Sequence, residues 1–228
     1  MTRLYLVRHG ENLANITKEF SYRAVDYPLT PKGVLQAEQT AEYFVNRDVD
    51  AIYTSPLLRA RQTAEIIARR IAVPVHLREE LREINVGSLE GASTPENWAL
   101  YHRISAAWYA GRAEVAFPDG EDLRMVAARF LGCVGEIVAA YTTGSAVIVG
   151  HGGVYTACIA LLCPEVDLPV LLTQPNHNCS ITHVEATLTK DGRVEGLLHA
   201  WASSSHLHGV AAEVISALPD DAPQTKLS

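Results

Sequence analysis

Apolar residues form two kinds of pattern along the chain, and segments of the two kinds alternate from the N-terminus onward. Short continuous apolar runs are typical of buried strands, and they lie at residues 3–8, 51–54, 74–77 and 147–150. Apolar residues that recur every three or four positions predict helices over residues 31–47, 57–70, 95–110, 122–141 and 152–162. Two later strands, 179–187 and 194–200, are joined by the turn signal Asp191-Gly192. Strands that alternate with helices predict an α/β fold, with a three-layer α/β/α arrangement around a mainly parallel central sheet.

The chain length of 228 residues suits a single domain. We expect this domain to span residues 1–218, with a helical cap inserted around 92–116. A domain of this size buries roughly 70% of the surface of its unfolded chain, so it needs neither disulfides nor a metal ion for stability. The segment 219–228 is polar and is expected to form a frayed tail.

Composition and charge exclude several classes of protein. A hydrophobic content of 48% and a charged content of 20% are ordinary for a globular protein. The net charge of −7 argues against non-specific binding to nucleic acid. No signal peptide and no apolar run of about 18 residues is present, so we expect a cytoplasmic protein without membrane partners. The cysteines form no CxxC pair and are expected to be buried and reduced. The sequence does not define the oligomeric state.

The first strand ends in Arg8-His9-Gly10, and this is where chemistry is expected. A fixed cation beside a histidine disfavours protonation, so the imidazole stays neutral and nucleophilic. A guanidinium binds phosphate well, and the glycine lets a bulky anion approach the backbone. The pair predicts attack by His9 on a phosphoryl group, although a structural histidine at a strand end is the plain alternative.

A second histidine, His151, ends the strand at 147–150 and opens the helix that follows through Gly152. Ligands of parallel α/β sheets bind at the carboxyl ends of the strands, where both histidines are expected to lie. The helix N-terminus at Gly152 offers N–H groups and a partial positive charge to an anion. The alternative for His151 is a residue that only caps the helix.

Further segments occur in a characteristic order, at residues 55–64, 81–91 and 147–153. Together with Arg8-His9-Gly10-Glu11 they resemble the motifs of the histidine phosphatase superfamily, also called the phosphoglycerate mutase-like superfamily. Smaller matches extend the resemblance from about residue 3 to about residue 207, at 26–30, 120–122 and 206–207.

The resemblance implies a phosphohistidine on His9, which water then hydrolyses. It places a phosphate clamp at Arg8 and Arg59, and planar guanidinium groups suit that task. Arg61 is two residues further along the same predicted helix, on another face, and is expected at the surface. Asn15 matches the asparagine that touches phosphate in the family.

At Asn12 the chain departs from the Thr or Ser that is usual in the family. This change puts details of the substrate in doubt, not the chemistry.

Glu83 is the candidate general acid, singled out by its place in the segment 81–91. A carboxyl group that faces a bound phosphate keeps its proton more readily, because like charges repel, and the leaving alkoxide needs that proton. The alternative is a surface glutamate among several neighbours. Glu90 in the same segment is expected to have a structural role.

The function that follows is metal-independent hydrolysis of phosphomonoesters of small molecules. No HxH or HExxH spacing indicates a metal site, and no cofactor is expected. Two alternatives stay open: a mutase that retains the phosphohistidine, and a non-catalytic binding module. Against the mutase, the segment 92–116 contains only Arg103 and Arg112 and no lysine. Three aromatic residues of this segment share one helical face: Trp98, Tyr101 and Trp108. They are expected either to pack within the cap or to form an apolar lid over the pocket.

Overall fold

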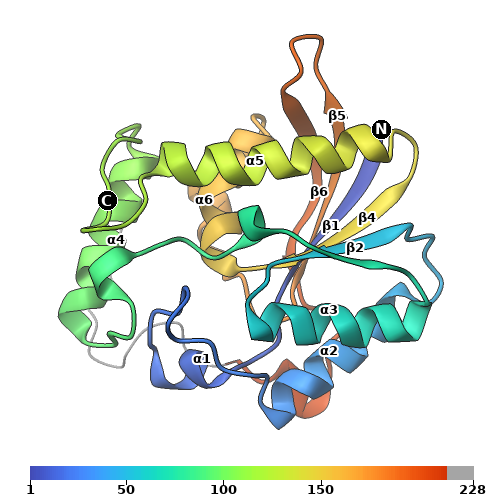
Figure 1. Ribbon diagram of the computed structural model, residues 1–228, viewed down its shortest axis with the longest axis horizontal. Helices are drawn as coiled ribbons and strands as arrows, with labels where there is room; N and C mark the ends of the chain where they lie inside the picture. The colour runs from blue at the N-terminus through green and yellow to red at the C-terminus, as the bar shows by residue number, and fades with distance from the viewer. Residues whose placement is uncertain (215–228) are drawn as a thin grey trace.

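The computed structural model describes residues 1–214 (Figure 1). Positions 215–218 and the predicted polar tail at 219–228 lie outside the described residues. The predicted fold class is confirmed: a mostly parallel six-stranded sheet is flanked by helices on both faces.

The strand order is β3-β2-β4-β1-β5-β6. The strands are β1 (Thr2–Arg8), β2 (Ala51–Thr54), β3 (Val75–Leu77), β4 (Ser145–Gly150), β5 (Ile181–Leu188) and β6 (Val194–Ser203). The four strands β1, β2, β3 and β4 run parallel to one another, whereas β5 and β6 add an antiparallel edge next to β1. The carboxyl ends of β1 and β4 are therefore neighbours at one edge of the sheet.

The helices are α1 (Leu13–Thr17), α2 (Pro31–Phe44), α3 (Leu58–Ile71), α4 (Pro95–Tyr109), α5 (Leu123–Ala140), α6 (Gly152–Leu162) and α7 (Leu168–Leu171). Helix α2 begins after the expected N-cap, since the Thr30 hydroxyl accepts the N–H of Gly33, but it ends before the predicted Arg47. The short helices α1 and α7 were not predicted, because each is too short to show a period in the sequence. The segment predicted as a cap contains α4, at one end of the molecule (Figure 1).

Alternate residues of the central strands face two separate cores, which is why three layers form. On β1, Leu4 and Leu6 pack with α5 and α6, while Tyr5 and Val7 pack with α2 and α3. All four side chains are buried. Both faces are thus apolar, as a parallel sheet covered on both sides requires.

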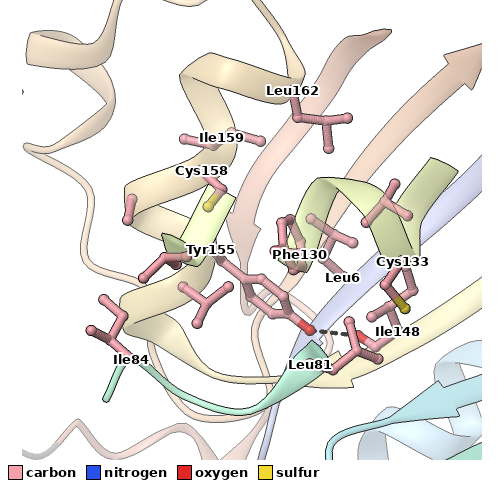
Figure 2. Packing of buried hydrophobic residues seen from close by; sticks show 14 of the residues in the cluster. Leu6, Leu81, Ile84, Phe130, Cys133, Ile148, Tyr155, Cys158, Ile159 and Leu162 are labelled. Carbon is pink, nitrogen blue, oxygen red and sulfur yellow. Dashed lines mark hydrogen bonds between the residues drawn. The ribbon is translucent and has the colours of Figure 1, made fainter. Parts of the chain in front are cut away.

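Tyr155 of α6 fixes that helix against β4 (Figure 2). Its hydroxyl donates to the carbonyl oxygen of Ile148 at 2.7 Å, and its ring packs against Phe130 of α5 at 5.9 Å between centroids. A buried hydroxyl needs such a partner. A Cβ atom at Gly150 would lie 2.6 Å from the Tyr155 oxygen, so the glycine before His151 allows this close approach. The turn that carries His151 is therefore held rigidly between β4 and α6.

Among the helices of residues 1–214, none combines the length and the apolar character needed to cross a membrane.

Candidate active site

His9 and His151 lie side by side at the ends of β1 and β4. The two strands pair in parallel with Arg8 opposite Gly150, so each histidine is the next residue after a paired strand end. Their ring centroids are 5.2 Å apart, and their side chains are 3% and 0% exposed. The predicted meeting of the two histidines at one edge of the sheet is observed.

The His9 ring is held with one nitrogen toward the backbone. Its Nδ1 lies 2.7 Å from the carbonyl oxygen of Gly10, so Nδ1 carries the proton and donates. Nε2 is then an acceptor, and Arg59 donates to it from Nε at 3.1 Å. Burial, followed by the charges of Arg59 and Arg8, lowers the pKa of His9 well below its ordinary value. The neutral imidazole expected from the sequence is present, with burial as its largest cause.

Arg59, in the first turn of α3, joins both histidines. Its Nη2 donates to Nδ1 of His151 at 3.2 Å and to the carbonyl oxygen of Ser21 at 2.9 Å. Its Nη1 has no hydrogen-bond partner and lies 3.7 Å from the Asp26 carboxylate. Burial lowers the pKa of Arg59 to about 10, so the group stays charged at neutral pH.

Arg8 is the second guanidinium of the site. Its Nη1 donates to the carbonyl oxygen of Asn176, and its Nε is buried without a partner. The side chain passes close to Gly152, where a Cβ atom would lie 3.3 Å from Arg8 Cδ. A buried, unpaired N–H on a cation is costly. Arg8 Nε and Arg59 Nη1 both lack a hydrogen-bond acceptor, although Asp26 lies 3.7 Å from the latter, and this points to an anionic ligand.

His151 does not cap α6 with its side chain, although it occupies the N-cap position. Its Nδ1 accepts from Arg59, so Nε2 carries the proton and donates to the Ser55 hydroxyl at 2.8 Å. Burial and the charge of Arg59 lower its pKa well below the ordinary value. Ser55 was part of a quoted motif but had no predicted role, and it fixes the tautomer of His151.

Glu83 binds the N-terminus of α6. Its Oε2 accepts the N–H of Gly153 and its Oε1 the N–H of Val154, both at 3.0 Å. The chain around it is anchored, since Leu81 and Ile84 are buried in the core beside Tyr155 (Figure 2). Helix N-termini attract anions. The anion found there is the Glu83 carboxylate, so these two N–H groups are not free as the sequence analysis expected.

Asn15 lies in α1 beside the site. Its side-chain oxygen accepts the N–H of Asn12 at 3.1 Å, and the Asn12 side chain accepts the N–H of Asn15 at 3.2 Å. This reciprocal capping starts α1, and it gives the departure at Asn12 a structural account. The phosphate-binding roles of Asn15 and Gly152 stay predictions.

Asn178, which the sequence analysis did not single out, holds the backbone at His9. Its Nδ2 donates to the carbonyl oxygen of His9 and to the side-chain oxygen of Asn15, both at 3.0 Å. The N–H of the next residue, Cys179, donates to the carbonyl oxygen of Arg8 at 3.0 Å. In the sequence, Asn178 is marked only by its place in a polar run before β5. Its position next to β1 follows from the pairing of β5 with β1, which the sequence does not show locally.

Arg61 lies at the surface and Glu90 has a structural role, as the sequence analysis expected. Arg61 is exposed and lies 3.8 Å from Glu65 of the same helix. The Glu90 carboxylate accepts backbone N–H groups of the loop 22–25, including those of Tyr22 at 3.0 Å and Ala24 at 2.6 Å. Glu90 therefore shapes the loop that follows Ser21, an Arg59 partner.

The three aromatic residues that share one face of α4 lie in two different surroundings. Trp108 is 3% exposed and donates its N–H to the carbonyl oxygen of Val115 at 2.6 Å, which is cap packing. Trp98 and Tyr101 instead line a cavity of about 1070 Å³ that begins at Arg8, His9 and Arg59. Within residues 1–214, no group of three or more His, Cys, Asp or Glu side chains is placed to hold a metal ion.

Comparison with known proteins identifies the family. Residues 4–196 match the model of the histidine phosphatase superfamily (branch 1), and the chain belongs to that superfamily. The chain is 32% identical over 167 residues to the uncharacterized phosphatase PhoE of Bacillus subtilis, covering 73% of this chain and 78% of that protein. It is 32% identical over 191 residues to a probable phosphoglycerate mutase, GpmB of Proteus mirabilis, covering 81% and 85%.

Solved structures agree with this assignment. A mycobacterial glucosyl-3-phosphoglycerate phosphatase superposes with a TM-score of 0.76 at 27% identity, over 89% of this chain and 99% of that one. YhfR of Bacillus stearothermophilus gives a TM-score of 0.73 at 29% identity, over 90% and 99%. The superfamily therefore includes both phosphatases and probable mutases among the relatives of this chain.

Proposed function

We propose that the protein is a metal-independent phosphatase, which hydrolyses phosphomonoesters of small molecules through a phosphohistidine on His9. One observation carries this proposal. Arg59, which is buried, and Arg8, which is half-buried, flank a buried and neutral imidazole, and each guanidinium has an N–H without a hydrogen-bond partner. A phosphoryl group satisfies both cations and brings its phosphorus atom to the histidine.

In the first step, Nε2 of His9 attacks the phosphorus atom. The N–P bond forms while the bond from phosphorus to the ester oxygen breaks. Arg59, which donates to Nε2 in the free protein, turns its N–H toward a phosphoryl oxygen and so frees the lone pair. Arg8, Arg59 and His151 stabilise the charge on the equatorial oxygens, with Asn15 and Gly152 as further contacts.

Glu83 supplies the proton that the leaving oxygen needs. In the free protein its carboxylate is bound by two N–H groups of α6. Glu83 takes up this proton from solvent before the step, so it enters the step as the carboxylic acid and leaves it as the carboxylate. In the second step, Glu83 takes a proton from a water molecule that attacks the phosphohistidine, the N–P bond breaks, and inorganic phosphate leaves.

The direct test is hydrolysis of 4-nitrophenyl phosphate by the purified protein in the presence of EDTA. We expect turnover that EDTA does not reduce and that His9→Ala abolishes. A strict requirement for an added divalent ion would contradict the metal-independent reaction. Failure to hydrolyse any phosphomonoester would favour the non-catalytic binding module.

The second candidate is a phosphoglycerate mutase, supported by the identity to GpmB. A mutase must exclude water from its phosphohistidine and retain the intermediate. The segment 92–116 contains no lysine, and its two arginines, Arg103 and Arg112, line the cavity but are exposed to water. The test supplies 3-phosphoglycerate with a catalytic amount of 2,3-bisphosphoglycerate. We expect phosphate release to exceed isomerisation, and the opposite ratio would establish the mutase.

A further inference from the structure

The cavity at the active site extends far beyond the space that a phosphoryl group needs. Its volume is about 1070 Å³, slightly above the range of typical small-molecule pockets. Arg8, His9 and Arg59 line it at the reacting end. The remainder is available to the leaving group of a substrate, so the side chains there decide which leaving groups bind.

One wall of this remainder is aromatic and fixed in place. Phe20, next to Ser21, packs against both Trp98 and Tyr101 of α4, with ring centroids 4.4 Å and 5.2 Å from its own. The indole N–H of Trp98 donates to the carbonyl oxygen of Lys18 at 2.9 Å. Because its only polar atom is bound within the protein, the Trp98 ring offers a ligand only its apolar surface.

A second aromatic group lines the same cavity from the sheet. Trp201 of β6 donates its N–H to the carbonyl oxygen of Gln174 at 3.2 Å, which again leaves only the ring for a ligand. Leu171 and Leu172, at the end of α7, line the cavity as well. Rigid aromatic and aliphatic walls bind flat apolar groups well, because little side-chain entropy is lost.

Charged side chains also line the cavity. Lys18 and Glu19 are half-buried neighbours of opposite charge, whereas Arg103 and Arg112 of the segment 92–116 are exposed to water. An ion pair with such a side chain is weak because water and salt screen it. A carboxylate or a second phosphate on the leaving group gains little from these two arginines, and the negative charge of Glu19 lies next to that of Lys18.

We infer that the preferred substrates are phosphomonoesters whose leaving group has a bulky, flat and apolar body, which binds against Trp98 and Trp201. This inference rests on the proposed function, since it concerns the leaving group of the same reaction. It assigns Trp98 and Trp201 the role of determining specificity, without any part in the bond-breaking step.

The experiment compares kcat/KM for 1-naphthyl phosphate and phenyl phosphate, whose leaving groups have similar acidity. We expect the naphthyl ester to be preferred roughly 10-fold, from its added apolar area and ring contact. Trp98→Ala and Trp201→Leu should each lower kcat/KM for the naphthyl ester more than for the phenyl ester, and so remove most of this preference. Tyr43→Leu, on α2 and outside the cavity, is the matched control and should keep the wild-type ratio.

A second measurement needs no variant to fold: inhibition of the wild-type protein by 1-naphthylphosphonate and phenylphosphonate. We expect tighter inhibition by the naphthyl compound. Equal rates and equal inhibition for the two ring sizes, or a higher kcat/KM for phosphoserine than for benzyl phosphate, would overturn the inference. Those results leave the proposed function intact, whereas failure of phenyl phosphate and all other esters to react would overturn that function.

Discussion

Arg59 connects the groups on which the proposed reaction depends. It donates to His9 and His151, and it is held by the carbonyl oxygen of Ser21. A lysine carries the same charge but cannot make these contacts together, because its single ammonium lacks the planar fork. We predict that Arg59→Lys lowers kcat/KM by roughly 10²–10³-fold, the usual loss for a charge-stabilising donor. Arg61→Lys, two residues away at the surface, is the control and should keep its activity.

Glu83 is expected to act through its proton, and leaving groups of different acidity test this. We predict that Glu83→Gln lowers the hydrolysis of alkyl phosphates by roughly 10²–10⁴-fold, because their alkoxides are strong bases. Aryl phosphates with acidic leaving groups should retain much of their rate. Steady-state kinetics over a series of esters measures the difference. Equal losses throughout the series would show that Glu83 does not donate the proton.

The sequence identified the residues with reactive side chains better than those that hold them. Arg8, His9 and His151 stand at strand ends and Arg59 lies in a segment that resembles a family motif, and the structure brings the four together. Asn178 escaped notice because its contacts to His9 and Asn15 depend on the pairing of β5 with β1, which no local pattern encodes.

The N-terminus of α6 is the element on which the site depends most directly. A Cβ atom at Gly153 would lie 2.6 Å from Glu83 Oε1, so a larger residue displaces the carboxylate. We predict that Gly153→Ala impairs alkyl phosphate hydrolysis selectively, as Glu83→Gln does. Activity equal to that of the wild type toward alkyl phosphates would contradict this.

Gly132→Ala is the matched control for a glycine within a helix. Gly132 lies exposed in α5, and a Cβ atom there meets nothing within 4 Å. This change should keep full activity and stabilise the protein by about 0.5–1 kcal/mol, because alanine favours helix more than glycine does. Urea unfolding measures the gain.

Elements with a strong period were predictable, and elements held by single polar contacts were not. Helices α2 to α6 and all strands follow the apolar pattern, with ends displaced by a few residues. Helix α1 forms because Asn12 and Asn15 cap it reciprocally, although Leu13 and Ile16 stay exposed. Helix α7 forms because Asp167 caps it and a proline follows. Such contacts carry no periodic signal.

Buried neutral histidines make the stability of the whole molecule depend on pH. Burial lowers the pKa of His9 and His151 well below the ordinary value, and burial with the charge of Arg47 lowers that of His206 to about 4. Below about pH 6.5 these histidines bind protons in the unfolded chain but stay unprotonated in the folded protein. Each such histidine therefore lowers the free energy of unfolding by up to about 1.4 kcal/mol per pH unit as the pH falls.

We predict that urea unfolding between pH 7 and pH 5 shows a steady loss of stability. His206→Gln should reduce the slope against pH, since glutamine does not titrate and can keep a hydrogen bond to Thr40. A free energy of unfolding that stays constant from pH 7 to pH 5 would contradict the burial of neutral histidines.

The central claim for the molecule as a whole is that a phosphoryl group passes through His9. In the most direct measurement, the protein is mixed with a radiolabelled phosphomonoester and the reaction is stopped without acid. The label shows whether the protein is phosphorylated, and mass spectrometry of the peptides identifies the phosphorylated residue. The account predicts a phosphorylated His9 in the wild-type protein and no phosphorylated protein in His9→Ala. A label on another residue, or full turnover by His9→Ala, would contradict it.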